Sequence, residues 1–136
     1  MKFILYTDGG SFGNPGPAGV GVVIRDKNKK IIKEMAKYIG EATNNQAEYK
    51  ALILGLEEAK KLGATEIDCY LDSELIVKQL NREYKIKDHG LGPFFIKIWN
   101  LSQSFKEINY HYIPREKNKE ADRLVNQAIN KIKKSK

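Results

Sequence analysis

The chain has 136 residues, of which 41% are hydrophobic and 30% charged, which is typical of a globular protein with one domain. It carries 24 basic and 17 acidic residues, and the resulting net charge of +7 favours a polyanionic partner such as nucleic acid. The single cysteine, Cys69, excludes an intrachain disulfide, and the apolar run at residues 3–6 is too short for a signal peptide or a membrane span, so we expect a cytoplasmic protein without membrane contact.

The first part of the sequence predicts a meander of three antiparallel strands. A loop rich in Gly and Pro follows the first strand, and the turn at residues 26–30 follows the second. Thr43 and Gln46 then form the capping-box signature of a helix start, and the apolar residues recur at helical spacing until Gly63. The expected strands span residues 2–8, 18–25 and 31–39.

In the second part of the sequence, strand and helix patterns alternate. The expected elements are a strand at 66–72, helices at 73–80 and 91–105, a strand at 108–113 and a last helix capped by Asn118. A meander followed by such alternation predicts an α/β fold, in which helices cover the faces of a mixed sheet. We expect one domain at residues 1–132 and a basic tail at residues 133–136.

Four carboxylates occupy unusual places in this scheme. Asp8 and Asp72 end two strands, and if these strands are parallel neighbours, both side chains lie at the same edge of the sheet. Glu48 and Asp122 each fall in the first turn of a helix, on or beside its apolar face. A carboxylate in such a position is unfavourable unless it is paired or bound to a metal.

Each carboxylate alone has an ordinary explanation as a turn residue, a cap or a partner of the helix dipole. Several converging carboxylates, however, repel one another strongly unless cations bind between them. Oxygen ligands without a His or Cys cluster favour Mg²⁺ or Mn²⁺ over zinc. Two such ions position the attacking water and the leaving oxygen of a phosphodiester. We therefore expect two Mg²⁺ ions per site with substrate, with Mn²⁺ as a substitute.

Four motifs resemble the type 1 ribonucleases H, in the order of that family and over nearly the whole chain: YTDGGSFGNPGPAGVG, TNNQAEYKAL, YLDSELIV and IPREKNKEADRLVNQA. The resemblance implies the ribonuclease H-like fold, a five-stranded mixed sheet flanked by helices. It also implies endonucleolytic cleavage of the RNA strand of an RNA/DNA hybrid, which leaves 5′-phosphate and 3′-hydroxyl ends. The catalytic, metal-binding positions that it implies are Asp8, Glu48, Asp72 and Asp122.

The same resemblance implies a set of substrate-binding residues. Small residues after Asp8 let the backbone approach the substrate closely, and amide side chains can read the 2′-hydroxyls that distinguish RNA from DNA. The Thr43 hydroxyl is expected to contact a phosphate as well as to cap its helix. The implied substrate-binding residues are Gly10, Ser11, Asn14, Thr43, Asn44, Asn45 and Gln46.

The sequence departs from the family pattern in two places. Many bacterial members carry a histidine in the loop before the last helix, and here Arg115 or Lys117 is the candidate to replace it as an electrostatic aid near the leaving phosphate. Arg115 is the favoured of the two, and the alternative is an ordinary surface ion pair with Glu116 or Glu120. Residues 81–93 also leave no room for the basic protrusion of well-known members. Tyr84, Lys85 and Lys87 either replace it in part or form a solvated loop.

Trp99 is expected in the core, and His89 in an exposed loop.

Two alternative functions stay open: a catalytically weak module that binds hybrids, or another nuclease of the same fold. The presence of all four carboxylates argues against the first, and TNNQAE argues against the second because it supplies RNA-strand recognition. We expect a monomer.

Overall fold

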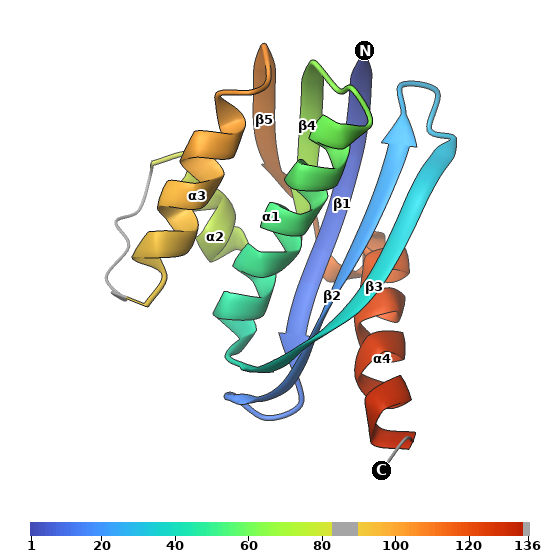
Figure 1. The fold of residues 1–136 in the computed structure, drawn as a ribbon, viewed down its shortest axis with the longest axis vertical. Helices are drawn as coiled ribbons and strands as arrows, with labels where there is room; N and C mark the ends of the chain where they lie inside the picture. The colour runs from blue at the N-terminus through green and yellow to red at the C-terminus, as the bar shows by residue number, and fades with distance from the viewer. Residues whose placement is uncertain (83–89, 135–136) are drawn as a thin grey trace.

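Five strands form one mixed sheet in the computed structural model, which describes residues 1–82 and 90–134 (Figure 1). The strands lie in the order β3-β2-β1-β4-β5. The strand β1 pairs antiparallel with β2, and β2 with β3, whereas β1 and β5 both pair parallel with β4. This topology confirms the expected fold. The elements are β1 (Lys2–Ser11), β2 (Gly16–Asp26), β3 (Ile31–Ala42), α1 (Asn44–Lys61), β4 (Glu66–Leu71), α2 (Glu74–Leu80), α3 (Gly92–Ser102), β5 (Glu107–Tyr112), the 3-10 turn η1 (Arg115–Lys117) and α4 (Lys119–Lys134).

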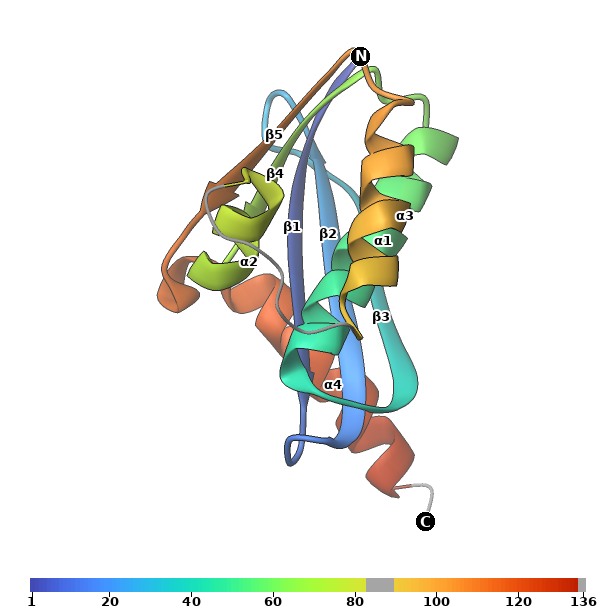
Figure 2. The same cartoon turned by 90° about the vertical axis from the view of Figure 1, so that its left-hand side faces the viewer.

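The helices lie on both faces of the sheet, as Figures 1 and 2 show. The helix α1 packs on β1 and β2 with α3 beside it, and α4 crosses the other face against β2 and β3. The close approach of α4 depends on Gly21, because a Cβ there would lie 2.2 Å from the carbonyl oxygen of Ala121. The core between α1 and the sheet contains the fully buried Leu5, Ile24, Leu52, Leu56, Ile67 and Leu71.

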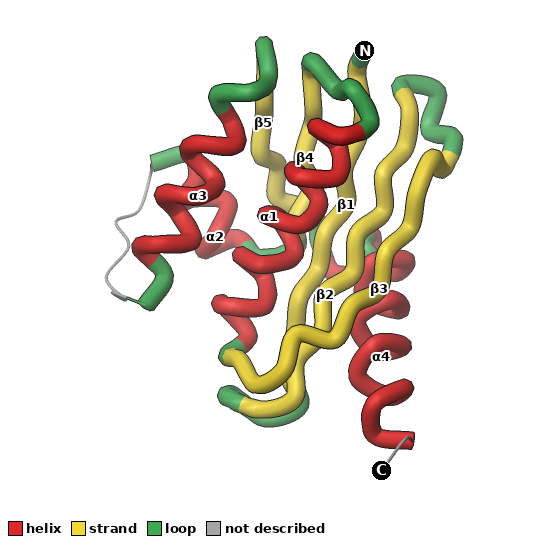
Figure 3. The backbone as a smooth tube through the Cα atoms, in the orientation of Figure 1, coloured by secondary structure: helices red, strands yellow, loops and turns green. Residues whose placement is uncertain are grey.

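The start of α1 is fixed by the predicted capping box. The Thr43 hydroxyl accepts a hydrogen bond from the Gln46 backbone N–H at 3.1 Å, and the Gln46 side chain accepts one from the Thr43 N–H at 3.0 Å. Figure 3 shows that β3 runs almost directly into α1, with Thr43 between them. The first turn of α1 is therefore held in a fixed position relative to the sheet. In the described parts of the chain, no helix is long and apolar enough to cross a membrane.

Several expected boundaries were wrong. The strand β1 continues to Ser11, because β2 remains paired with it after the last β1–β4 pair, Thr7 with Leu71. Asp8 thus lies inside β1, rather than at its end. The helix α3 ends at Ser102, three residues before the expected end.

The expected burial of Trp99 was also wrong. The helix α3 buries Ile98, which leaves 47% of Trp99 exposed with the Arg82 guanidinium 4.4 Å from its ring centroid. The predictions for Tyr84, Lys85, Lys87 and His89 fall outside the described residues.

Candidate active site

Three carboxylates meet at the edge of the sheet where β4 ends. Asp8 and Asp72 each follow directly after the last parallel pair of β1 and β4, Thr7 with Leu71. Glu48 reaches them from the beginning of α1. One carboxylate oxygen from each of the three residues lies within 4.8 Å of the other two. The structure thus brings together side chains that are far apart in the sequence.

Gly9 makes this meeting possible, and the sequence analysis did not single it out. A Cβ at Gly9 would lie 2.2 Å from the carbonyl carbon and oxygen of Ala47, so a side chain here would push α1 away from β1. The Gly9 N–H donates a hydrogen bond of 3.2 Å to Oε1 of Glu48. The available signal was the double glycine directly after Asp8, whose first member contacts the helix.

Burial makes the carboxylates hard to ionise without a cation. Burial, followed by repulsion from Asp72 and Asp122, raises the pKa of Asp8 to about 7. Burial also raises the pKa of Glu48 well above its usual range, with Asp8 and Asp72 adding to the rise. For Asp72, burial raises the pKa, against the lowering effect of a hydrogen bond from Asn118 and the charge of Arg115.

These residues fit a hard divalent cation. The donors are all carboxylate oxygens, which is the set preferred by Mg²⁺ and Mn²⁺. Oε2 of Glu48 is buried and has no hydrogen-bond partner among the described residues, so one oxygen in the cluster remains available as a ligand. A bound cation would also offset the repulsion and desolvation that raise the three pKa values.

Asn118 has a role at this site that the sequence analysis missed. Its side chain amide donates hydrogen bonds to the Thr7 carbonyl oxygen at 2.9 Å and to Oδ2 of Asp72 at 3.1 Å. It directly precedes α4 as expected, and its backbone carbonyl accepts from the Asp122 N–H at 3.1 Å. Its side chain oxygen, however, has no partner among the described residues, so the expected side chain cap is not formed. Asn118 instead links α4 to β1 and to Asp72.

Asp122 lies at the site but outside the three-carboxylate cluster. It lines the groove of about 520 Å³ that leads to the carboxylates. Its Oδ1 is 3.3 Å from Nη2 of Arg115 in an ion pair. The Arg115 side chain is 77% exposed, so its guanidinium is accessible from the groove. Glu120, another acidic residue near Arg115 in sequence, pairs with Arg25 instead.

A groove of about 520 Å³ leads to the carboxylates. Gly10, Ser11, Asn44 and Asn45 line it, and their role in substrate binding stays a prediction. Two side chain amides hold its walls together: Oδ1 of Asn14 accepts from the Asn44 N–H, and Oδ1 of Asn44 accepts from the Ser11 N–H, each at 2.9 Å. Asn14, Thr43 and Gln46 are not among the residues that line the groove, and Thr43 and Gln46 are joined to each other in the capping box.

Comparisons with known proteins agree with this architecture. The model of the reverse transcriptase-like family matches residues 6–128. The structure of ribonuclease H1 from Halobacterium salinarum superposes with a TM-score of 0.94 at 39% identity, over 96% of this chain and 99% of that one. LC11-RNase H1 in complex with an RNA/DNA hybrid superposes with a TM-score of 0.92 at 47% identity, over 96% and 98%.

The comparisons also include a longer protein. The N-terminal ribonuclease H domain of Rv2228c from Mycobacterium tuberculosis superposes with a TM-score of 0.92 at 44% identity, over 95% of this chain and 99% of that one. The complete bifunctional protein Rv2228c is 45% identical over 130 residues, and this chain spans only 36% of its length. The matched family model, these relatives and the carboxylate cluster agree: the chain belongs to the ribonuclease HI family.

Proposed function

We propose that this chain is an endoribonuclease that hydrolyses the RNA strand of RNA/DNA hybrids and leaves 5′-phosphate and 3′-hydroxyl ends. The observation that carries the proposal is the cluster of Asp8, Glu48 and Asp72, whose oxygens lie within 4.8 Å of one another at the end of an open groove. A relative at 47% identity has been crystallised with such a hybrid. The net charge of +7 suits a nucleic acid, and binding should therefore weaken as salt increases.

The three clustered carboxylates would hold the metal, with Mg²⁺ as the expected ion, Mn²⁺ as its substitute and two ions when substrate is present. When bound, such ions activate water and stabilise the leaving oxygen. Asp122 lies at the edge of this site and is the fourth acidic contributor. Arg115 places a positive charge beside it, where it would interact with the phosphate at which the bond to the 3′-oxygen breaks. Asn118 keeps Asp72 in a fixed orientation.

Recognition of the hybrid would follow from the groove. The strand end at Gly10 and Ser11 and the first turn of α1 at Asn44 and Asn45 form its walls. Small residues permit close approach of the sugar-phosphate backbone, and the amides offer partners for 2′-hydroxyls and base edges. The proposed substrate-binding set also includes Asn14, Thr43 and Gln46, which do not line the groove. Recognition of this kind predicts cleavage that does not depend on the base sequence. We also expect the enzyme to act as a monomer.

Cleavage of an end-labelled RNA annealed to DNA, with Mg²⁺ or with EDTA, tests the proposal. Asp72→Asn should abolish cleavage, whereas Asp68→Asn is the matched control, because Asp68 lies on β4 but pairs with Lys2 outside the cluster. Double-stranded RNA and double-stranded DNA serve as comparison substrates. Tight binding of the hybrid without cutting, in both Mg²⁺ and Mn²⁺, would overturn the proposal in favour of a hybrid-binding module.

A further inference from the structure

A row of stacked rings crosses the sheet beside the active site but outside the carboxylate cluster. Tyr6 on β1 is in register with Tyr70 on β4, and Tyr70 with His111 on β5. The ring centroids of the first pair are 5.2 Å apart and those of the second pair 5.0 Å, with interplanar angles of 18° and 27°. Because side chains alternate along a strand, this row lies on the opposite face from Leu5, which packs under α1.

The row ends at a cavity. The residue of β2 in register with Tyr6 is Val23, an aliphatic side chain that is only 1% exposed, so the row of rings stops at Tyr6. A cavity of about 330 Å³ lies here, lined by Tyr6, Val23 and Arg25 together with residues of the segment before α4. The cavity therefore adjoins Tyr6, whose ring is the last of the row. An aromatic group bound in the cavity would contact this ring.

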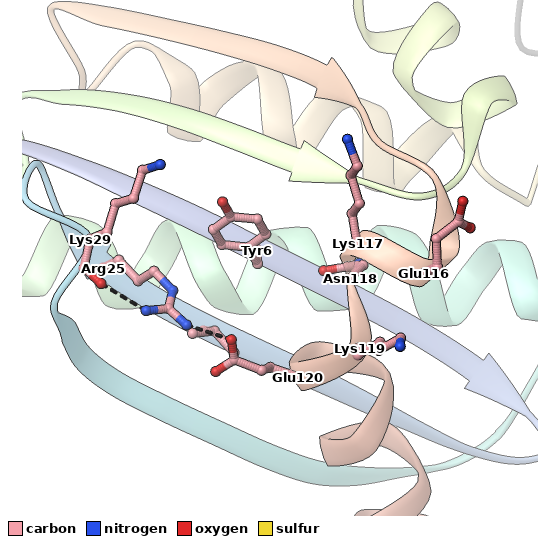
Figure 4. A pocket seen from close by; sticks show the side chains of 9 residues that line it. Tyr6, Arg25, Lys29, Glu116, Lys117, Asn118, Lys119 and Glu120 are labelled. Carbon is pink, nitrogen blue, oxygen red and sulfur yellow. Dashed lines mark hydrogen bonds and ion pairs between the residues drawn. The ribbon is translucent and has the colours of Figure 1, made fainter.

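The mouth of this cavity is cationic. Arg25 is held in place by an ion pair with Glu120 and by donating to the Lys29 carbonyl oxygen at 2.7 Å. Figure 4 shows Lys29 and Lys117 on either side of Tyr6, with both ammonium groups directed to the same side. The figure also shows the Glu116 carboxylate directed away from Tyr6. Within the described residues, neither lysine has an ion pair, so both charges are available to an anion.

We propose that this cavity binds a nucleotide, with the base against the ring of Tyr6 and the phosphate between Lys29 and Lys117. An aromatic ring and two nearby cations are features that recognise an unpaired nucleotide. A volume of about 330 Å³ is at the lower end for small-ligand sites, which suits one nucleotide rather than a duplex. The source is either a free mononucleotide or an unpaired residue of a nucleic-acid strand.

The cavity and the active site share a wall, and the test must separate them. Asn118 lines this cavity and also bonds to Asp72. The titration of ¹⁵N-labelled protein with 5′-AMP is therefore carried out in EDTA, so that no metal can hold the phosphate at the carboxylates. We expect saturable changes in the amide signals of Tyr6, Val23 and Lys29. Changes confined to residues around Asp8 and Asp72, or no saturation, would overturn the proposal.

Variants assign the binding to the cavity. Tyr6→Leu should weaken binding of 5′-AMP about tenfold through loss of stacking. Lys29→Gln and Lys117→Gln should weaken 5′-AMP but leave adenosine unchanged, whereas Lys119→Gln is the matched control, since Figure 4 shows its ammonium directed away from Tyr6. Unchanged affinity for 5′-AMP in Tyr6→Leu, together with unchanged affinity in Lys29→Gln and Lys117→Gln, would contradict the proposal.

A single-stranded DNA oligonucleotide distinguishes the two sources. If the same amide signals respond to the oligonucleotide at a lower concentration than to 5′-AMP, the site takes an unpaired residue of a strand. If they respond better to 5′-AMP, the site takes the free nucleotide. If the oligonucleotide affects only the groove beside Asp8 and 5′-AMP affects neither place, the cavity is not a nucleotide site.

Discussion

The side chain amide of Asn118 joins Asp72 to the backbone of β1. It donates at 3.1 Å to Oδ2 of Asp72 and at 2.9 Å to the Thr7 carbonyl oxygen, and Asn118 itself is only 2% exposed. Thr7 lies in β1, Asp72 directly follows the neighbouring parallel strand β4, and Asn118 directly precedes α4. One buried side chain thus sets the orientation of a carboxylate from the cluster relative to the strand that carries Asp8.

Removal of this contact should affect the chemistry more than hybrid binding. We expect Asn118→Ala to lower kcat and the apparent Mg²⁺ affinity about 10- to 100-fold with little change in the KM for the hybrid, because residues that orient metal ligands have effects of this size. Asn118→Asp should be worse, since it places a second carboxylate beside Asp72. Steady-state cleavage over a range of Mg²⁺ concentrations measures both quantities.

Asn109→Ala is the matched control for this prediction. The Asn109 amide also donates at 3.1 Å to an aspartate, Asp68, but on an exposed part of the sheet. Asn109→Ala should therefore leave kcat unchanged. A loss of thermal stability in Asn118→Ala with normal kcat and normal Mg²⁺ dependence would show that Asn118 has only a structural role.

Gly9 and Gly10 should respond differently to the same substitution. Gly9→Ala would place a Cβ 2.2 Å from backbone atoms of Ala47, so α1 must shift away from β1. We expect a loss of about 2–4 kcal/mol in the free energy of unfolding, together with loss of cleavage. In Gly10→Ala the nearest atom would be 3.7 Å away, which is an ordinary contact, so stability should be nearly unchanged. Chemical denaturation of the two variants provides the comparison, and equal losses would contradict it.

The metal-free protein should become less stable as the pH rises toward neutrality. Burial raises the pKa of Asp8 to about 7 and raises that of Glu48 as well. In the unfolded chain these groups titrate near pH ~4, so the folded state binds more protons above that pH. The stability that the protonated groups contribute is therefore present below about pH 4 and is lost as the pH rises through about 7.

Thermal unfolding in EDTA and in Mg²⁺ across this pH range measures the effect. Mg²⁺ should raise the Tm most at neutral pH, where the carboxylates are ionised only at a cost in free energy. Glu48→Gln should flatten the dependence in EDTA, because one of the groups that releases a proton is gone. Parallel curves for Glu48→Gln and the unaltered protein would rule out this origin of the pH dependence.

Arg115 should contribute to rate rather than to stability. Its ion pair with Asp122 is exposed, so Arg115→Ala should change the free energy of unfolding by less than about 1 kcal/mol. We expect cleavage to slow about tenfold or more through loss of positive charge near the phosphate, with partial recovery in Arg115→Lys. Arg123→Ala is the matched control, since Arg123 forms a similar exposed ion pair with Glu34 at 3.2 Å. If both alanine variants cleave at the normal rate, Arg115 is not catalytic.

Sequence patterns were sufficient to predict the fold class and the three carboxylates that meet in the cluster. Local signals were sufficient for this, because turn residues, helical spacing and the Thr43 capping box act within a few residues of the chain. The unusual positions of Asp8, Glu48 and Asp72 also indicated their convergence, since parallel neighbouring strands end at one edge of a sheet.

Tertiary packing, rather than local sequence, set the length of β1 at the carboxylate edge and the contacts of Asn118, Gly9 and Val23. β1 runs past Asp8 because β2 continues to pair with it, and strand length depends on the neighbouring strand more than on local sequence. The links from Asn118 to Asp72, from Gly9 to α1 and from Val23 to the row of rings each join segments that are distant in sequence. Packing and cross-strand register create these contacts, and of the three residues only Gly9 carries a local signal, as the first member of the double glycine after Asp8.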